Sequence, residues 1–509
     1  MQGHFGDRWN GLFIFGRELR PENALFWLLL ALLVWLPVPL GSNRVWAWSL
    51  MEAAAFALAA AWAILWALGR VAITPSLARA SPALALLALW IAYQAFHLVP
   101  LPSAWVEVLS PQAARMHSLA AMGVPSQSMT LSLDPHATDA ALLKALAYGA
   151  VFFLVLALVG TRSRVRTFSL VLVCAAVLHA VYAVLMHLAD RTVPQFGELI
   201  THGASASGTY ANRNHFAGYL EMMLALGIGL LLAGLSEGRA DSWKRWVAHV
   251  LEWILSPAMV LRLALCILVI ALTTTHSRTG NTAFFASLLV AGTIGIVLSR
   301  HATRKTLILL ASLVVIDLVI VGSWFGVEKL ARRLEETTLT DVRVREEPAA
   351  YALDIIKDYP LFGSGPGTFA STFPRYRPET VVDYFDYAHN DYAQIGAETG
   401  LIGLGLMGLL VGASLAAALL AQWRRRDPLM RGMAFAAVMG ITAMLIHSWT
   451  DFNLQIPANA SLFMVLLALG WISLGLDGKH GTRKSDSGSG SGIAGRSTVF
   501  PKSLTLRAI

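Results

Sequence analysis

Long apolar runs recur along nearly the whole chain and limit its possible folds more than any other feature. A run of about 17 to 25 apolar residues crosses about 30 Å of hydrocarbon as a helix. Only helices and closed barrels satisfy the backbone in lipid, and the alternation typical of barrel strands is absent from this sequence. The sequence therefore predicts an all-α polytopic membrane protein.

Composition and the placement of charge agree with this fold class. Of the 509 residues, 56% are hydrophobic and 14% are charged, against roughly 25% charged residues in soluble domains. The formal net charge of +8 would suit nucleic acid if it formed one patch, but the basic residues concentrate in short loops between apolar runs. We therefore expect the lipid bilayer as a partner and no nucleic acid.

About twelve membrane spans are predicted, with both termini in the cytoplasm. Short arginine-rich loops, such as 162–166 and 424–426, are then cytoplasmic, as the positive-inside rule requires. Arg8, Arg17 and Arg20 precede the first apolar run and predict a retained signal anchor. The predicted spans are 24–40, 46–68, 82–99, 139–160, 167–188, 215–235, 261–275, 281–299, 306–324, 400–422, 432–449 and 460–476.

The stretch 325–399 is the longest segment assigned to the outer side. It is too long for an idle connection and predicts a small helical subdomain. Its glycine-rich run 361–369 predicts a tight turn and not a phosphate-binding loop, because no strand precedes it and no Gly-Lys-Ser/Thr follows it. The serine- and glycine-rich tail 477–509 predicts a disordered cytoplasmic segment.

His389 is the strongest catalytic candidate. It lies in a polar loop crowded with ionisable side chains, directly before an apolar helix. Imidazole accepts and returns a proton near neutral pH, which is the work of a general base. The alternative is that Asn390 or Asp391 caps the following helix and that His389 is a solvated loop residue.

Two arginines are candidates for binding phosphate at the same face. Arg278 lies between two apolar runs with almost no loop, and Arg213 lies between Asn212 and Asn214 at the start of another run. The planar fork of arginine suits phosphate oxygens. The alternatives are snorkelling of Arg278 to the lipid headgroups and helix capping by Asn212 or Asn214.

A last polar turn, 447–459, contains Asp451 and Asn453. Its density of amides and acids exceeds the needs of a simple turn. Four polar clusters from separated parts of the chain thus reach one face of the membrane. A lipid-diphosphate sugar donor requires cations at its phosphates, a base for the acceptor hydroxyl and hydrogen-bonding groups for sugar. No ATP site and no other cofactor are expected, because such a donor carries its own leaving group.

Five stretches resemble the O-antigen ligase and polymerase superfamily of bacterial inner-membrane glycosyltransferases. The resemblance covers roughly residues 200–470, with the stretches in family order. Each alone is weak, but the five together are specific to the superfamily, although not to one member. They are Gly208–Tyr219, Ser277–Gly280, Pro360–Phe369, Ala388–Tyr392 with Glu398–Gly403, and Asp451–Asn459.

The resemblance implies transfer of a glycan from undecaprenyl diphosphate at the periplasmic face of the inner membrane. His389 would be the base or the group that orients the acceptor, and Arg278, with Arg213, would hold the diphosphate. Supporting or sugar-binding roles would fall to Asn390, Asn212, Asn214, Asp451 and Asn453. Family ligases are thought to work without a metal, and no metal is predicted here, although Asp383, Asp386 and Asp391 leave that point open.

The resemblance divides the chain at about residue 200. Residues 1–200 are N-terminal transmembrane helices and 201–476 are the ligase-like region. Lipid A core is the favoured acceptor for lipopolysaccharide biosynthesis, while a polymerase would lengthen a lipid-linked glycan or exopolysaccharide and an oligosaccharyltransferase would modify protein. A transporter of lipid-linked glycans is the alternative of another class. It would require a polar path across the whole bilayer. A structural scaffold for envelope assembly is a third possibility, in which His389 would have no role in any chemistry.

Overall fold

The computed structural model describes residues 21–122, 127–201, 205–234, 257–298, 339–378 and 384–476, together with a few isolated positions between these ranges. Four predictions lie wholly or mostly outside the described residues. They are the arginines of the signal anchor, the span 306–324, the role of Asp383 and the disordered tail 477–509.

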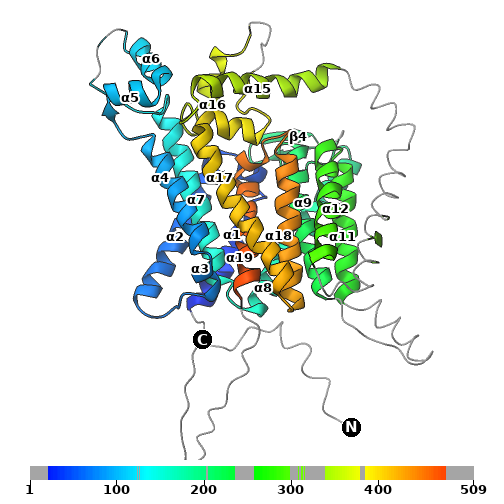
Figure 1. Ribbon diagram of the computed structural model, residues 1–509. Coiled ribbons are helices and arrows are strands. Elements are labelled where there is room, and N and C mark those ends of the chain that lie inside the picture. Colours follow the sequence, from blue (N-terminus) through cyan, green and yellow to red (C-terminus); the bar gives the residue numbers. More distant parts are fainter. Residues whose placement is uncertain are drawn as a thin grey trace, which may run out of the picture. The chain divides into compact units, whose positions relative to one another are not determined.

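The chain is an all-α membrane protein, and Figure 1 shows its long helices lying alongside one another. Eight of the described helices are long and apolar enough to cross a membrane. They are α2 (Val45–Ala67), α7 (Pro135–Leu158), α8 (Arg162–Leu188), α9 (Arg213–Ala233), α12 (Arg278–Leu298), α17 (Asp391–Arg424), α18 (Pro428–His447) and α19 (Pro457–Gly475).

Three shorter apolar helices accompany these eight. They are α1 (Pro21–Trp35), α4 (Ser81–Phe96) and α11 (Pro257–Thr274). Eleven of the twelve predicted spans therefore overlap a described apolar helix. The count of twelve stays a prediction, because only eight of the described helices have both the length and the hydropathy of a span, and 306–324 lies mostly outside the described residues.

The remaining described elements lie between these helices. The helical ones are η1 (Leu40–Ser42), α3 (Pro75–Arg79), α5 (Ser103–Leu109), α6 (Pro111–Ala120), α15 (Leu339–Asp358), α16 (Phe369–Thr372), η2 (Phe373–Arg375) and η3 (Asn453–Gln455). Strand β1 (Leu101–Pro102) pairs antiparallel with β2 (Ser128–Met129), and β3 (Thr192–Gln195) pairs antiparallel with β4 (Glu198–Thr201).

Helices α9, α18 and α19 form the centre of the bundle. Side chains all around α9 and α19 are buried, as expected for helices surrounded by other helices and not by lipid. The most extensive contact between two elements is that of α9 with α18. Gly229 and Gly432 allow it, because a Cβ on either would lie 2.2–2.3 Å from the other's carbonyl oxygen. Small residues at such crossings let backbones approach closely in membranes.

Helix α17 begins before the predicted membrane span 400–422. Asn390 caps it, and the helix runs from Asp391, with a break at Gly400 where φ is +64°. The predicted outer segment 325–399 therefore ends in a first helical stretch, 391–399. The break at Gly400 coincides with the start of the apolar run, which is where the span was predicted to begin.

The glycine-rich run before α17 is the predicted tight turn. Gly363, Gly365 and Gly367 all have positive φ. A Cβ on Gly363 would lie 2.3 Å from backbone atoms of Glu398 in α17. The Glu398 carboxylate accepts hydrogen bonds from the backbone N–H of Gly367 at 2.8 Å and of Phe369 at 3.2 Å. Two stretches that carried the family resemblance thus pack directly on each other.

A second, smaller hydrophobic cluster lies beside this turn. It joins the segment 101–131 to α15, α16 and the start of α17 through side chains such as Val106, Ile355 and Phe373. A separate subdomain in 325–399 stays a prediction, because 325–338 and 379–383 lie outside the described residues.

Candidate active site

His389 is the last loop residue but one before α17. Its backbone φ is +51°, a left-handed conformation that few non-glycine residues adopt. Such strain is retained only where surrounding contacts hold it, and it concentrates at functional sites. The imidazole is 25% exposed, so it is positioned by the protein and still open to a substrate.

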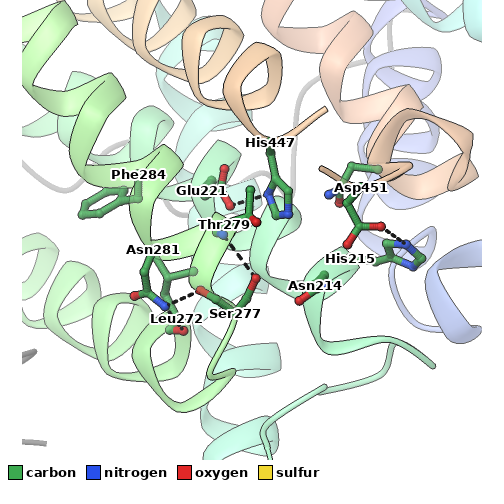
Figure 2. A network of polar contacts seen from close by, with 12 residues as sticks. Asn214, His215, Glu221, Leu272, Ser277, Thr279, Asn281, Phe284, His447 and Asp451 are labelled. Atoms are coloured by element: carbon green, nitrogen blue, oxygen red, sulfur yellow. Dashed lines mark hydrogen bonds and ion pairs between the residues drawn. The ribbon is translucent and has the colours of Figure 1, made fainter. Parts of the chain in front are cut away.

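Asp451 lies between His389 and a second histidine. Its Oδ1 is 3.9 Å from His389 Nδ1 and 3.5 Å from His215 Nε2, and its side chain is only 2% exposed. Figure 2 shows the Asp451 carboxylate directed at His215, which comes from the first turn of α9. The loop between α18 and α19 thus places a carboxylate beside the candidate base.

The charge state of Asp451 follows from its neighbours. Burial alone would raise its pKa, but the close approach and charge of His215, the charge of His447 and the backbone N–H of Phe452 together lower the pKa well below its usual range. Asp451 is therefore ionised at neutral pH. A carboxylate in this position orients an imidazole and stabilises the imidazolium that forms when it accepts a proton.

Aromatic rings hold the two histidines in place. Phe452 lies edge-to-face against His389 at 4.7 Å and against His215 at 4.6 Å between centroids. Tyr387 stacks on the same ring at 4.5 Å. Burial raises the pKa of Tyr387 to about 12, so its phenol stays protonated near neutral pH and is a hydrogen-bond donor.

Asn390 and Asp391 fasten this loop to the end of α18. The Asn390 side chain accepts from Ala393 N and donates to the carbonyl of Trp449 at 2.8 Å. The Asp391 carboxylate accepts from the Ser448 hydroxyl at 2.8 Å and from Leu454 N at 3.1 Å. The capping alternative is thus confirmed for Asn390, while Asp391 ties the start of α17 to the last outer turn.

Arg278 is the first residue of α12 and is exposed. The next residue, Thr279, shares a hydrogen bond of 2.7 Å with Thr450, which adjoins Asp451. Trp449, the partner of Asn390, adjoins Thr450 on its other side. Two hydrogen bonds therefore connect the Arg278 turn, through the loop 448–452, to the loop that carries His389.

The start of α9 brings the Asn-Arg-Asn-His run to the same region. Asn212 caps the helix by accepting from Asn214 N at 2.8 Å, which confirms the capping alternative for Asn212. Arg213 follows it half-buried, and Asn214 is buried. His215, two residues after Arg213, reaches Asp451, so the two candidate arginines begin helices that both border the Asp451 loop.

Asn453 lies in the bundle interior and packs between helices. It is fully buried, and a Cβ on Gly218 of α9 would lie 2.3 Å from its Oδ1. That oxygen accepts from Asn459 Nδ2 at 2.9 Å, and the same amide donates to the His215 carbonyl. These contacts join α9 to α19, and a sugar-binding role for Asn453 stays a prediction.

The structure adds a pair that the sequence candidates did not include. His447 Nδ1 lies 2.8 Å from Glu221 Oε1, and neither side chain is exposed (Figure 2). Glu221 is on α9 and His447 ends α18. The signal in the sequence was an ionisable residue inside an apolar span, which is rare and usually functional.

Among the residues that the structure describes, no group of three or more His, Cys, Asp or Glu side chains has the arrangement of a metal site. Asp386 lies in the described part of the loop, and Asp391 uses its oxygens as hydrogen-bond acceptors for the last outer turn.

Comparison with known families bears on this geometry. Residues 263–408 match the family model described as O-Antigen ligase. The match assigns an O-antigen ligase domain to residues 263–408. The match confirms the resemblance drawn from the sequence motifs. A comparison with curated proteins finds no match.

The O-antigen ligase domain includes part of the site. The matched range contains Arg278, His389 and Asn390, whereas Arg213, His215 and Asp451 lie outside it and reach the same region through the fold. Members of this family are membrane glycosyltransferases of the ligase and polymerase type, and the family implies lipid-linked glycan substrates.

Proposed function

We propose that the protein transfers a glycan from undecaprenyl diphosphate to an acceptor hydroxyl, with a lipid A core sugar as the favoured acceptor. The main support is the position of His389, whose Nδ1 lies 3.9 Å from Oδ1 of the buried Asp451. The loop that contains Asp451 is hydrogen-bonded to both the His389 loop and the Arg278 turn. The network joins a candidate base to a candidate phosphate-binding arginine, which are the two groups such a transfer needs.

In the proposed reaction, the acceptor oxygen attacks the anomeric carbon of the donor glycan. His389 takes the proton of the acceptor hydroxyl, and Asp451 stabilises the imidazolium that results. The bond between the anomeric carbon and the phosphate oxygen breaks, and the electron pair leaves with the lipid diphosphate. Arg278, with Arg213, stabilises the negative charge of that leaving group. By the family resemblance, the anomeric configuration inverts.

The proposed location is the bacterial inner membrane, with the site facing the periplasm and both termini in the cytoplasm. The arginine-rich segments 162–166 and 424–426 support this orientation, because α8 begins and α17 ends there, and the ion pair of Arg162 with Asp427 places both on the side opposite to the start of α17. In this orientation, the lipid-linked donor and the acceptor meet on the outer side.

The test uses purified protein in detergent with an undecaprenyl-diphosphate-linked glycan. Release of the lipid diphosphate and the size of the glycan products are followed for the wild type and for His389→Ala. We expect acceptor-dependent release by the wild type and its loss in His389→Ala, with donor binding retained, because a base lowers a barrier more than it stabilises the bound ground state.

The products separate the alternatives. Attachment of the glycan to lipid A core indicates a ligase, and lengthening of the lipid-linked glycan indicates a polymerase. If no acceptor supports release and the lipid instead crosses the bilayer of proteoliposomes, the protein is a transporter and the role proposed for His389 is wrong.

A further inference from the structure

Glu221 and His447 form a hydrogen-bonded pair in the interior of the bundle. Both side chains are fully buried, and the two atoms that meet are 2.8 Å apart. Glu221 Oε2 and His447 Nε2 have no hydrogen-bond partner among the described residues. A buried pair with unsatisfied atoms costs stability relative to apolar packing. Stability alone is therefore a poor reason for this pair.

One side of the pair supports the turn that presents Arg278. A Cβ on Gly280 would lie 3.0 Å from Glu221 Oε1 and 2.6 Å from the Cβ of Ala217. The backbone N–H of Gly280 also donates to the Ser277 hydroxyl at 3.1 Å. The first turn of α12 thus packs against the Glu221 carboxylate at Gly280, and Figure 2 shows the neighbouring Thr279 near Glu221.

The other side of the pair begins the loop that carries Asp451. His447 is the last residue of α18. The residues after it contact the rest of the site one by one: Ser448 reaches Asp391, Thr450 reaches Thr279, and Asp451 reaches His389. A shift of His447 would therefore move the partner of the candidate base.

We propose that Glu221 and His447 are a positioning pair that fixes the separation between the Arg278 turn and the Asp451 loop. The pair sits between these two segments and contacts or continues into each of them. Its proposed effect is to hold the diphosphate of the donor and the base in one geometry during transfer, where small displacements are costly. This inference rests on the proposed function and adds two residues that lie outside the matched range 263–408.

The first test measures amide hydrogen exchange in the full-length protein in detergent. Glu221→Leu removes the acceptor for His447 at similar volume. We expect faster exchange in both 273–281 and 448–453, because each segment loses its contact with the pair. The matched control is Leu230→Ala, a buried position farther along the same helix, which should leave exchange in these two segments unchanged even if it lowers the melting temperature.

The second test is a double-mutant cycle on lipid-diphosphate release. Glu221→Leu should lower kcat at least 30-fold, and Glu221→Gln should retain most of the activity, because an amide oxygen still accepts from His447. The pair acts through the Arg278 turn, so the effects of Glu221→Leu and Arg278→Lys should not be independent. The fold-loss of activity in the double variant should be at least tenfold smaller than the product of the two single fold-losses.

Three results would overturn the inference. The first is unchanged amide exchange in both segments of Glu221→Leu. The second is a double variant whose loss of kcat equals the product of the two single losses. The third is a loss of kcat in Leu230→Ala as large as that in Glu221→Leu when the two variants have equal melting temperatures. If Glu221→Leu fails to fold, Glu221→Leu/His447→Leu, which removes the contact without leaving an unpaired buried polar group, carries both measurements, and strict multiplication of its loss with that of Arg278→Lys refutes the pair. A wild type that releases no lipid diphosphate instead refutes the proposed function, and the exchange experiment still tests the pair.

Discussion

Replacement of Asp451 by Asn tests the proposed base most directly. The change removes the negative charge beside His389 and keeps the shape of the side chain and its acceptor oxygen. Two unit charges at the observed 3.9 Å attract by about 4 kcal/mol at an effective dielectric constant near 20 and by about 1 kcal/mol in bulk water. Because His389 is a quarter exposed and Asp451 is buried, an intermediate value of about 2 kcal/mol is appropriate.

In Asp451→Asn, this attraction no longer stabilises the transition state in which His389 becomes positively charged. We therefore expect kcat to fall about 30-fold in Asp451→Asn, with a smaller change in KM for the donor. The assay is lipid-diphosphate release by purified protein at saturating donor and acceptor. The control is Asp354→Asn, which removes an exposed carboxylate paired with Lys357 in α15 and should leave kcat unchanged. A kcat of Asp451→Asn within twofold of the wild type would refute the proposed link between Asp451 and His389.

The lowered pKa of Asp451 adds an expectation for stability against pH. The native carboxylate resists protonation more strongly than the unfolded one, so its charge contributes stability above the unfolded value of about 3.9. This contribution is lost only as the pH falls from there through the lower native pKa. The difference in melting temperature between the wild type and Asp451→Asn should thus be constant from pH 5 to 8 and shrink below about pH 3.9. A difference that disappears between pH 5 and 7 would contradict this account.

Three further substitutions test the arginine, the cap and the glycine turn. Arg278→Lys should lower kcat/KM for the donor at least about tenfold, because an ammonium cannot form the bidentate fork; wild-type turnover would instead favour snorkelling to the headgroups. Asn390→Ala should lower the free energy of unfolding by about 1–2 kcal/mol, because α17 loses its cap, whereas Asn390→Asp should retain the cap. Equal melting temperatures for the wild type and Asn390→Ala would refute a stabilising role of the cap. Gly363→Ala forces a Cβ to 2.3 Å from backbone atoms of α17 at a φ of +75°, and should cost at least about 3 kcal/mol. Gly412→Ala, which has open space around its Cβ, is the control, and an equal effect of both changes in thermal unfolding would contradict the clash.

Local features of the sequence were enough to predict several parts of this protein. Apolar runs long enough to span lipid indicated an all-α membrane protein, because each helix satisfies its own backbone in lipid. The glycine-rich run 361–369 was correctly predicted as a turn, since positive φ is a property of single residues. The motifs also indicated the family that the match at 263–408 confirmed.

Boundaries and capping were less accessible from the sequence. The span in α17 was predicted to start at residue 400, whereas the helix itself starts at Asp391, because polar residues on its first turns are buried by contacts that hydropathy does not report. Asn390 and Asn212 were candidates for both capping and binding, and only the observed hydrogen bonds show that each is a cap.

The sequence by itself thus determined the membrane-spanning helical class, the glycine turn and the candidates His389 and Arg278, since each depends on residue type or on local pattern. Only the tertiary structure decided that Asp451 lies between His215 and His389, and that Glu221 pairs with His447 from 226 positions away. The physical reason is that a charge or hydrogen bond acts over a few ångströms of space, and the distance between two such residues is set by how the helices pack and not by their separation along the chain.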